Sequence, residues 1–425
     1  MSPNTSLQAP EFAPPASFEV LRLPVYRRAL LAAVMTVSGL WMLETVLYWT
    51  VSVQTRSGAA VGLVVTFVII PALVFVLPSG VAIDRFGPRP VMLIGLGGLI
   101  VTAAGGGLVT GTVPLDVPIA LLIAFLLGAF DVVWEVPSNV LIGRVVEDRL
   151  MAGAISLATL QNGFGRVFGG VVSGLLLQVA GPAAAMALGG LVVLAAALLT
   201  LTLPSPRGLG GAGAKVVLTD FRDAVLWVVR QPTALVLIAL GCCVGLFGFS
   251  YLALVPVIAR LLNAGPNALG LLTGAGGAGI ILAALVTELF GRRLGRGRMV
   301  AAVLIGAGLA VAGLGIASNL SAAVVLAALT SGFLMIWTST NSLMLQKLAL
   351  EKMRGRALAV FWFIFWGILP IGTSLAGVLS DRFGARLVLI LMGTLMIASA
   401  ALVAAVYRPL LRVDIAADGR VVMQG

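Results

Sequence analysis

Four ionisable side chains lie inside long apolar segments of this sequence, where charged groups are rare. They are Glu44, Asp131, Glu135 and Arg166. If these segments cross a membrane, each charge is costly there, so it faces a cavity, has a partner, or both. Carboxyl groups in such a place can bind and release protons or hold a polar ligand. We therefore take the four as candidate proton-coupling and substrate residues.

Asp131 and Glu135 occur in "GAFDVVWEVPSN" and are four residues apart, hence on one face of a helix. Trp134 and Ser138 extend this face into a polar, aromatic stripe, and we assign Trp134 to the substrate cavity. Two close carboxylates in a low dielectric disfavour the doubly charged form, so one can keep a proton near neutral pH. The alternative is a structural ion pair, which for Asp131 stays equally open. For Glu135 no partner is evident, which favours function.

Arg166 is the predicted partner of Asp131. The two lie about 11 and 14 residues from the same end of their helices, so at 1.5 Å per residue their depths differ by roughly 5 Å. We therefore expect a buried ion pair that shapes the cavity.

Glu44 has Trp41 and Tyr48 on its own helical face, three residues before and four residues after it. An acid flanked by aromatic rings suits an amphipathic or cationic substrate, and it also suits proton coupling. The alternative is a glutamate near the outer interface that local water reaches. We assign Trp41 and Tyr48 to the substrate cavity.

The composition is that of a membrane protein that crosses the bilayer many times. Of the 425 residues, 60% are hydrophobic and 10% are charged, against about a quarter charged in soluble domains. The 52 glycines fit membrane helices that approach closely. Twelve apolar segments are each long enough to span. They lie at about 28–51, 58–80, 90–110, 117–141, 152–178, 183–203, 232–258, 267–290, 299–317, 321–346, 357–379 and 386–406.

These spans predict an all-α membrane protein with twelve transmembrane helices in two six-helix bundles. We expect a disordered cytosolic tail (1–27), an N-terminal bundle (28–203), a cytosolic linker (204–231), a C-terminal bundle (232–406) and a cytosolic C-terminal tail (407–425). The linker ends in an amphipathic segment, Leu218–Arg230, which would lie along the membrane surface.

The 27 Lys and Arg residues indicate the orientation. With the N-terminus inside, the outer loops hold only Arg56, Arg260, Arg382 and Arg386, and Arg166 lies within a span. The other 22 are cytosolic. The net charge of +11 is thus a signal of topology and of attraction to anionic lipid, and nucleic acid is not expected as a partner. Both termini are predicted to be cytoplasmic.

Several kinds of chemistry are excluded. The chain has no histidine, and its two cysteines are adjacent, so imidazole catalysis, a disulfide framework and a CxxC metal site are absent. It contains no GxxxxGK[ST], HExxH or GxSxG motif. We expect neither an enzyme nor a bound cofactor or metal.

A charged turn, "SGVAIDRFGPRPVML", separates the second and third spans. Its spacing is G-x-x-x-D-R-x-G-x-R, formed by Gly80, Asp84, Arg85, Gly87 and Arg89. The first glycine allows a close helix contact, the aspartate can accept bonds from a helix end, and the arginines can anchor to lipid phosphate. The alternative is a turn that only fixes topology. The same spacing recurs at 377–386, in "AGVLSDRFGARLVLI".

This loop, after the second of twelve spans, resembles the loop motif of the major facilitator superfamily. Further segments resemble its bacterial branch of enterobactin-exporter-like or transmembrane secretion effector efflux proteins: "NGFGRVFGGVVSGLLLQVAGPAAAM" (162–186), "FRDAVLWVVRQP" (221–232), "LFGRRLGRGRM" (289–299) and "KMRGRALAVF" (352–361). Two features depart from that branch. Leu40 follows Gly39 where it usually has Asp or Asn, and span five has Gly169-Gly170 where drug antiporters often carry Gly-Pro.

The resemblance implies alternating access around a cavity lined by spans one, four, seven and ten, with 80–89 as a gating loop. It therefore gives Trp337 and Asn341 of "WTSTNS" a place in the substrate cavity, although such residues often only join helices. Nested inverted three-helix repeats of the superfamily explain why an outer turn at 377–386 echoes an inner one.

We predict a monomeric secondary-active exporter in a bacterial inner membrane. Its partners would be a small amphipathic substrate, such as a drug, siderophore or metabolite, together with protons and lipid. A proton from outside would bind the acids and leave inside as substrate exits. The alternatives are a transporter-like receptor or sensor without net transport, and a passive facilitator or lipid transporter. Nothing in the sequence identifies the substrate.

Overall fold

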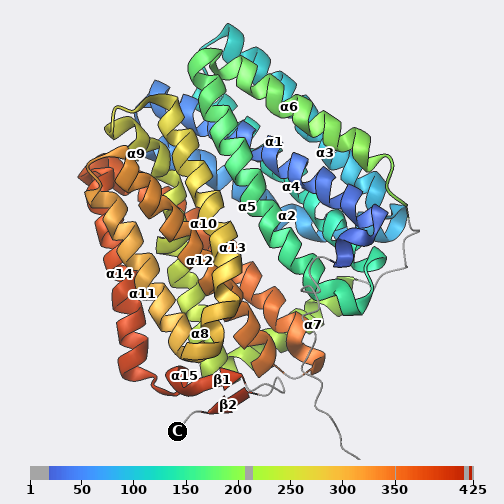
Figure 1. The fold of residues 1–425 in the computed structure, drawn as a ribbon, viewed down its shortest axis with the longest axis vertical. Helices are drawn as coiled ribbons and strands as arrows, with labels where there is room; N and C mark the ends of the chain where they lie inside the picture. The colour runs from blue at the N-terminus through green and yellow to red at the C-terminus, as the bar shows by residue number, and fades with distance from the viewer. Residues whose placement is uncertain (1–18, 206–213, 350, 416–420, 424–425) are drawn as a thin grey trace, which may run out of the picture.

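The computed structural model describes residues 19–205, 214–349, 351–415 and 421–423. Long helices dominate it (Figure 1). Before the linker lie η1 (Glu19–Arg22), α1 (Pro24–Thr55), α2 (Gly58–Phe86), α3 (Pro88–Thr112), α4 (Val117–Val145), α5 (Asp148–Val179) and α6 (Gly181–Thr200). The linker holds α7 (Ala214–Arg230).

The second half contains α8 (Pro232–Cys243), η2 (Val244–Gly248), η3 (Phe249–Ala253), α9 (Val255–Leu261), α10 (Gly265–Leu294), α11 (Arg296–Ile316), α12 (Leu320–Leu348), η4 (Glu351–Met353), α13 (Arg354–Phe383), α14 (Ala385–Val406), α15 (Pro409–Arg412), β1 (Val413–Ile415) and β2 (Val421–Met423). The predicted spans match these helices, most of which run a few residues further at one or both ends. The seventh span is irregular, because η2 is a π-helical turn and η3 a 3₁₀ turn. Such turns interrupt the regular ladder of hydrogen bonds.

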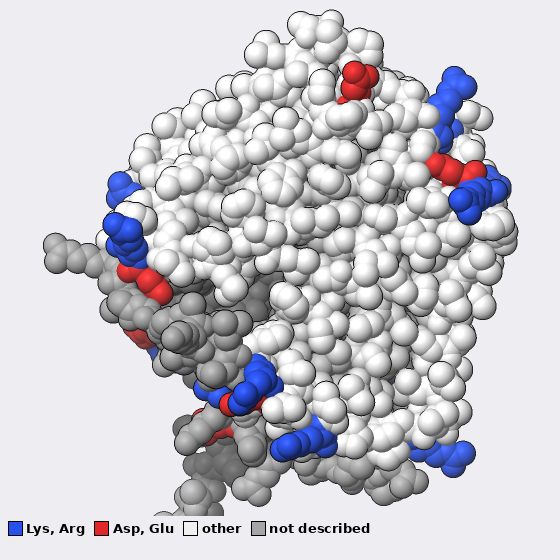
Figure 2. All heavy atoms as spheres, turned by 180° about the vertical axis from the view of Figure 1, so that it is seen from behind, with Lys and Arg blue, Asp and Glu red and all other residues white. Residues whose placement is uncertain are grey.

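Within the described part of the chain, eleven segments are long and apolar enough to cross a membrane. The remaining long helix of the bundles, α5, is more polar because it carries Gln161, Asn162 and Arg166. The face in Figure 2 agrees with a membrane-embedded body. Its charged side chains lie at two rims, and a broad uncharged belt separates them.

The helices before and after the linker surround two separate apolar cores. Leu43, Leu47 and Leu96 lie in the first, and Leu304 and Phe361 lie in the second. Each helix presents small residues where a neighbour comes close. In α4, for instance, a Cβ at Gly128 would overlap the backbone of Val68 in α2. Two helix pairs, α5 with α10 and α2 with α13, join the two halves along what we call the seam.

The loops gather at two ends of the molecule. The linker end holds α7 and the α2–α3 and α4–α5 turns, and the far end holds the α1–α2, α9–α10 and α13–α14 turns (Figure 1). At the far end, Arg260 donates to the carbonyl oxygens of Ser52 (2.7 Å) and Arg56 (3.2 Å). At the linker end, Arg89 donates to the carbonyl oxygen of Leu203 (3.0 Å). The loops that the charge pattern assigned to one side therefore lie together.

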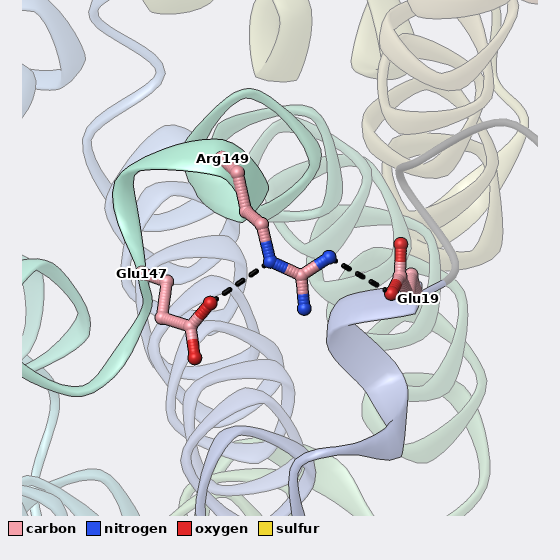
Figure 3. Close-up of polar contacts among 3 residues, drawn as sticks. All are labelled: Glu19, Glu147 and Arg149. Atoms are coloured by element: carbon pink, nitrogen blue, oxygen red, sulfur yellow. Dashed lines mark hydrogen bonds and ion pairs between the residues drawn. The ribbon is translucent and has the colours of Figure 1, made fainter.

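The expected disordered tail, residues 1–27, differs from the structure in its last part. Residues 19–22 form η1, which places Val20 in an apolar cluster with the α4–α5 region. Arg149 donates to Glu19 (3.1 Å) and to Glu147 (2.9 Å), as Figure 3 shows. These contacts order the chain just before α1, and residues 1–18 lie outside the described residues.

The C-terminal segment also has structure. It forms α15 and a two-stranded antiparallel sheet, in which Val413 pairs with Met423. This small sheet is an addition to an otherwise helical fold. Its strands are too short for the pattern of apolar residues to predict them.

The seam is closed toward the far end and opens toward the linker end. Near the far end, Gly62 of α2 packs against α13, and Thr66 bonds to Pro370 (3.0 Å), Thr373 and Ser374 (both 2.8 Å). Further along α2, residues 76–78 are all exposed. Because three successive residues cover about 200° of a helix, this part of α2 has neighbours on one side only.

The first prediction concerns the close packing of helix backbones at glycine residues. Gly128→Ala should destabilise the N-terminal bundle by about 1–3 kcal/mol, because its methyl group meets backbone that has to move. Gly105→Ala is the matched control, since nothing lies within 4 Å of a Cβ there. Thermal unfolding in detergent should show a lower midpoint for Gly128→Ala alone. Equal midpoints for the two variants would contradict the packing.

Candidate functional site

Arg166 connects the two halves of the molecule. Its side chain is 5% exposed, and its Nη2 donates to the hydroxyl of Tyr251 in η3 (3.1 Å). That hydroxyl shares a 2.6 Å hydrogen bond with Ser331 in α12. The guanidinium carbon also lies 4.6 Å from the centre of the Trp41 ring in α1. One side chain from α5 thus contacts α1 of its own bundle and η3 of the other, and the Tyr251 hydroxyl connects it to α12.

Glycines in α5 and α10 make room for this arrangement. In α5, Gly165 and Gly169 face α1, while Gly170 faces α10, so the helix fits between the two. In α10, a Cβ at Gly276 would lie 2.5 Å from Nη2 of Arg166. The guanidinium therefore occupies space that a larger residue would fill.

A small cavity with a mostly apolar lining adjoins Arg166. Its volume is about 30 Å³, which is enough for a water molecule or two. The residues that line it are Arg166, Phe249, Tyr251, Ile280, Ser331, Leu334 and Met335. Nε of Arg166 is buried and has no hydrogen-bond partner. The arginine thus keeps one donor that a ligand or water can use.

Glu44 lies beside this centre on α1. It is 8% exposed and accepts a 3.2 Å hydrogen bond from the hydroxyl of Tyr48. It is close enough to Arg166 to interact electrostatically. The face that carries Trp41, Glu44 and Tyr48 therefore points to the seam, where both aromatic residues make polar contacts.

Asp131 and Glu135 on α4, together with Glu44 on α1, form a group of three acidic residues. Asp131 interacts electrostatically with both Glu135 and Glu44. Asp131 is half-buried, and Glu135 is exposed. In the described part of the chain, neither forms a hydrogen bond or ion pair, and no acidic cluster there has the arrangement of a metal site. In this conformation the two acids thus keep their full capacity to accept hydrogen bonds.

The predicted pair of Asp131 with Arg166 is wrong for this conformation. The ion pairs among described residues all lie at the linker end and are exposed. Similar depth along two helices does not mean that their side chains point toward each other. Helix α4 packs against α2, α3 and α1, whereas α5 packs against α1, α6 and α10. Arg166 consequently extends across the seam, where its hydrogen-bond partner is Tyr251.

Trp134 does not line the seam, contrary to expectation. It is 3% exposed, and a Cβ at Gly95 of α3 would lie 2.7 Å from its backbone nitrogen. Three residues turn a helix by about 300°, so Trp134 lies to one side of Asp131. In this helix that side is the interior of the N-terminal bundle.

Trp337 and Asn341 are fully buried in the C-terminal bundle. The α12 residues at the small cavity are instead Ser331, Leu334 and Met335. The indole nitrogen of Trp337 and both amide atoms of Asn341 lack hydrogen-bond partners, as do three hydroxyls of the same helix. This stripe of α12 is therefore polar but does not reach the cavity in this conformation.

Two residues that are hydrogen-bonded around Arg166, Tyr251 and Ser331, were not predicted from the sequence. Tyr251 lies in an irregular turn that no periodic pattern predicts. Nothing in the sequence distinguishes Ser331 from other serines in the apolar spans. The available signal was scarcity, because the whole chain has only four tyrosines. A tyrosine hydroxyl in an apolar span needs a partner.

The loop that is predicted to gate, residues 80–89, forms a tight helix–helix turn. Gly87 ends α2 with a φ of 83°, a conformation that favours glycine. The Arg85 guanidinium lies over the ring of Phe86, 5.2 Å from its centre. The close helix contact expected at Gly80 is absent, since nothing lies within 4 Å of a Cβ there. The seam is open at this end, which removes the neighbour that Gly80 would meet.

Solved structures share this fold at low sequence identity. The nucleoside transporter NupG matches with a TM-score of 0.74 and 13% identity, over 90% of this chain and 99% of that one. A bacterial homologue of the human lysosomal transporter Spinster matches at 0.68 and 15%, over 89% and 96%. A D-xylose–proton symporter matches at 0.68 and 16%, over 88% and 96%. No curated protein matches the sequence.

The family itself is established by sequence. The model of the Major Facilitator Superfamily matches residues 29–373, which is most of the chain and includes the four charged residues of the spans and the loop at 80–89. The fold agrees with this match throughout. The chain therefore belongs to the Major Facilitator Superfamily and is a secondary transporter, not an enzyme.

Proposed function

We propose that this protein exports a small amphipathic molecule in exchange for protons, by alternating access, and acts as a monomer in a bacterial inner membrane. The motifs that it shares with the enterobactin-exporter-like branch support outward transport. The observation that carries the proposal is the placement of Glu44, Arg166 and Tyr251. These groups lie buried in the seam, where any relative movement of the bundles must change their contacts.

The orientation rests on the arrangement of charges. The loops at the linker end carry most of the Lys and Arg residues, which favours the cytoplasm. Exposed Leu226 and Val229 on α7 suit a helix that lies at the inner membrane surface. With this orientation, both termini are cytoplasmic, and the seam opens toward the cytoplasm. The Spinster homologue is likewise in an inward-facing conformation.

Proton and substrate would compete for the same carboxylates. Glu44 accepts a hydrogen bond from Tyr48 and lies one turn from Trp41 on the same helix, a combination of acid and aromatic ring that can hold a cationic or amphipathic group. A proton on Glu44 removes that attraction and also ends its electrostatic interaction with Arg166. Asp131 and Glu135 extend the acidic path along α4 toward the linker end. Exclusive occupancy by a proton or by substrate is the physical basis of exchange.

Transport in reconstituted vesicles tests this function. Purified protein in proteoliposomes, with an imposed pH gradient, would be screened with lipophilic cations, catecholate siderophores and amphipathic antibiotics. The proposal expects uphill movement of at least one compound that collapses when a protonophore removes the gradient. Saturable flux without pH dependence would indicate a facilitator, and binding without flux would indicate a receptor.

The coupling acids make the second prediction. Glu44→Gln and Glu135→Gln fix the neutral form with little change of shape, so each variant should lose uphill export. Glu44→Gln should also bind a cationic substrate more weakly, and that binding should no longer depend on the pH through Glu44. Counterflow exchange should survive. Equilibrium binding and pH-driven export would be measured side by side. If both variants concentrate substrate as well as the parent, neither acid is the coupling site, and Asp131→Asn is then the variant that should fail.

The bond between Arg166 and Tyr251 makes the third prediction. Tyr251→Phe leaves Nη2 of Arg166 and the Ser331 hydroxyl without this partner, which should cost about 1–3 kcal/mol and lower both thermal stability and transport. Tyr407→Phe is the matched control, because its hydroxyl bonds Thr233 (2.8 Å) in a half-buried place away from the seam. It should transport normally. Equal transport by the two variants would remove Tyr251 from the site.

A further inference from the structure

Two turns with the same sequence spacing lie at opposite ends of the molecule. The first joins α2 to α3 at the linker end, and the second joins α13 to α14 at the far end. Each helix ends at a glycine with positive φ, 83° at Gly87 and 85° at Gly384, and the next helix begins directly after it. Asp84 and Asp381 hold equivalent positions, as do Gly80 and Gly377. The two turns are structurally equivalent but have different surroundings.

Asp381 caps the N-terminus of α2 across the seam. Its carboxylate accepts hydrogen bonds from the Ser57 hydroxyl (2.6 Å), the Gly58 N–H (2.5 Å) and the Ala59 N–H (3.1 Å). The first N–H groups of a helix have no partner within it, and that end carries partial positive charge. A carboxylate from one bundle therefore satisfies the helix end of the other.

Backbone contact accompanies this cap. Gly377 lies against Gly58 so closely that a Cβ on either residue would overlap its neighbours. Arg260 reinforces the same corner from α9, since it donates to the carbonyl oxygens of Ser52 and Arg56 at the end of α1. The C-terminal bundle thus supplies an anion to the start of α2 and a cation to the end of α1, as both helix dipoles favour.

The equivalent aspartate at the linker end is not engaged. In the described residues, Asp84 accepts no hydrogen bond, and nothing lies within 4 Å of a Cβ at Gly80. The N-terminus of α13 also has no side-chain cap, because its N-cap residue is Met353. Helices α2 and α13 run antiparallel along the seam, so Asp84 and the α13 N-terminus belong to the same end.

We propose that Asp381 is a latch that holds the seam closed at the far end by capping α2. When the linker end closes, this cap breaks, and Asp84 becomes the engaged aspartate. The two copies of the motif therefore stabilise opposite conformations. The inference rests on alternating access, but its test needs no substrate and no pH gradient.

The test measures access to the seam from outside. In a background with Cys242 and Cys243 replaced by alanine, Thr373→Cys places a reporter that is buried between α2 and α13. It lies eight residues before Asp381, or about 12 Å along the helix. The rate of its modification by a membrane-impermeant maleimide, applied to protein in proteoliposomes and in detergent, reports opening of the far end.

Asp381→Asn keeps the shape of the side chain but removes its charge. The labelling rate should rise about two- to fivefold, the range expected when a charge at an exposed helix N-terminus is lost. Gly377→Ala should also raise the rate, by steric overlap and without a change of charge. Arg382→Gln is the matched control on the adjacent exposed residue and should leave the rate unchanged. Asp84→Asn should lower it.

Unchanged labelling in folded Asp381→Asn would overturn the latch, as would an equal rise in Arg382→Gln. Folding is checked by gel filtration and thermal unfolding, and Gly377→Ala with Ser57→Ala keeps the proposal testable if Asp381→Asn does not fold. A labelling shift in a protein that moves no compound of the screen would support the latch and refute the proposed export. Proton-driven export with unshifted labelling would support the proposed export and refute the latch.

Discussion

Most polar groups at membrane depth find their partners inside this protein, because lipid offers none. The backbone solves the problem by helix formation, and hydroxyls solve it by bonding back to the preceding turn. In α1, Thr36 bonds to Ala32 (2.9 Å) and Thr50 to Val46 (2.8 Å). Charged side chains have no such local solution. The two charged side chains that are buried at membrane depth, Glu44 and Arg166, lie where the two bundles meet, and this gives the seam a polar centre.

The seam has to be tight and separable at once. Glycine provides the tightness, since α5 and α10 approach with backbone against backbone at Gly170 and Gly270. Contacts of this kind depend on shape and lose little when broken and remade, because no large side chain has to repack. Hydrogen bonds among hydroxyls, such as Thr66 with Thr373 (2.8 Å), can likewise be broken and remade without repacking of large side chains. The interface resembles a surface between two packed bodies more than the interior of one.

Periodicity and charge predicted much of this fold. Twelve apolar segments correspond to the long helices and the interrupted α8–α9 segment, because span length and hydropathy are local properties that the bilayer imposes. The pattern of Lys and Arg grouped the loops as the structure groups them. The irregular turn at 244–253 was not predictable, since it depends on how η2 and η3 pack against α13. The order of residues 19–22 depends likewise on a distant partner, Arg149.

The site was predicted less well, and the failures share one cause. A single sequence gives depth along a helix but not the direction in which the helix faces within the bundle. Asp131 and Arg166 have similar depth and still face different neighbours, and Trp134 turns into its own bundle against Gly95. By contrast, Trp41, Glu44 and Tyr48 are on one helix, where spacing alone sets direction. Their shared face was therefore predictable, whereas the partners Tyr251 and Ser331, on other elements, were not.

The absence of a carboxylate bonded to Arg166 among the described residues suits a movable seam. A buried ion pair is strongly destabilised when its partners separate, so a tight pair across the seam would hold the protein in one conformation. Here the guanidinium is held by a hydroxyl (3.1 Å) and an aromatic face, which are weaker and can be exchanged for water or ligand. Glu44 is near enough to offset part of the charge but not bonded to it. The arginine is thereby stabilised in place without fixing the bundles. In the proposed exchange, a change in the charge of Glu44 would therefore alter the balance between closure and opening.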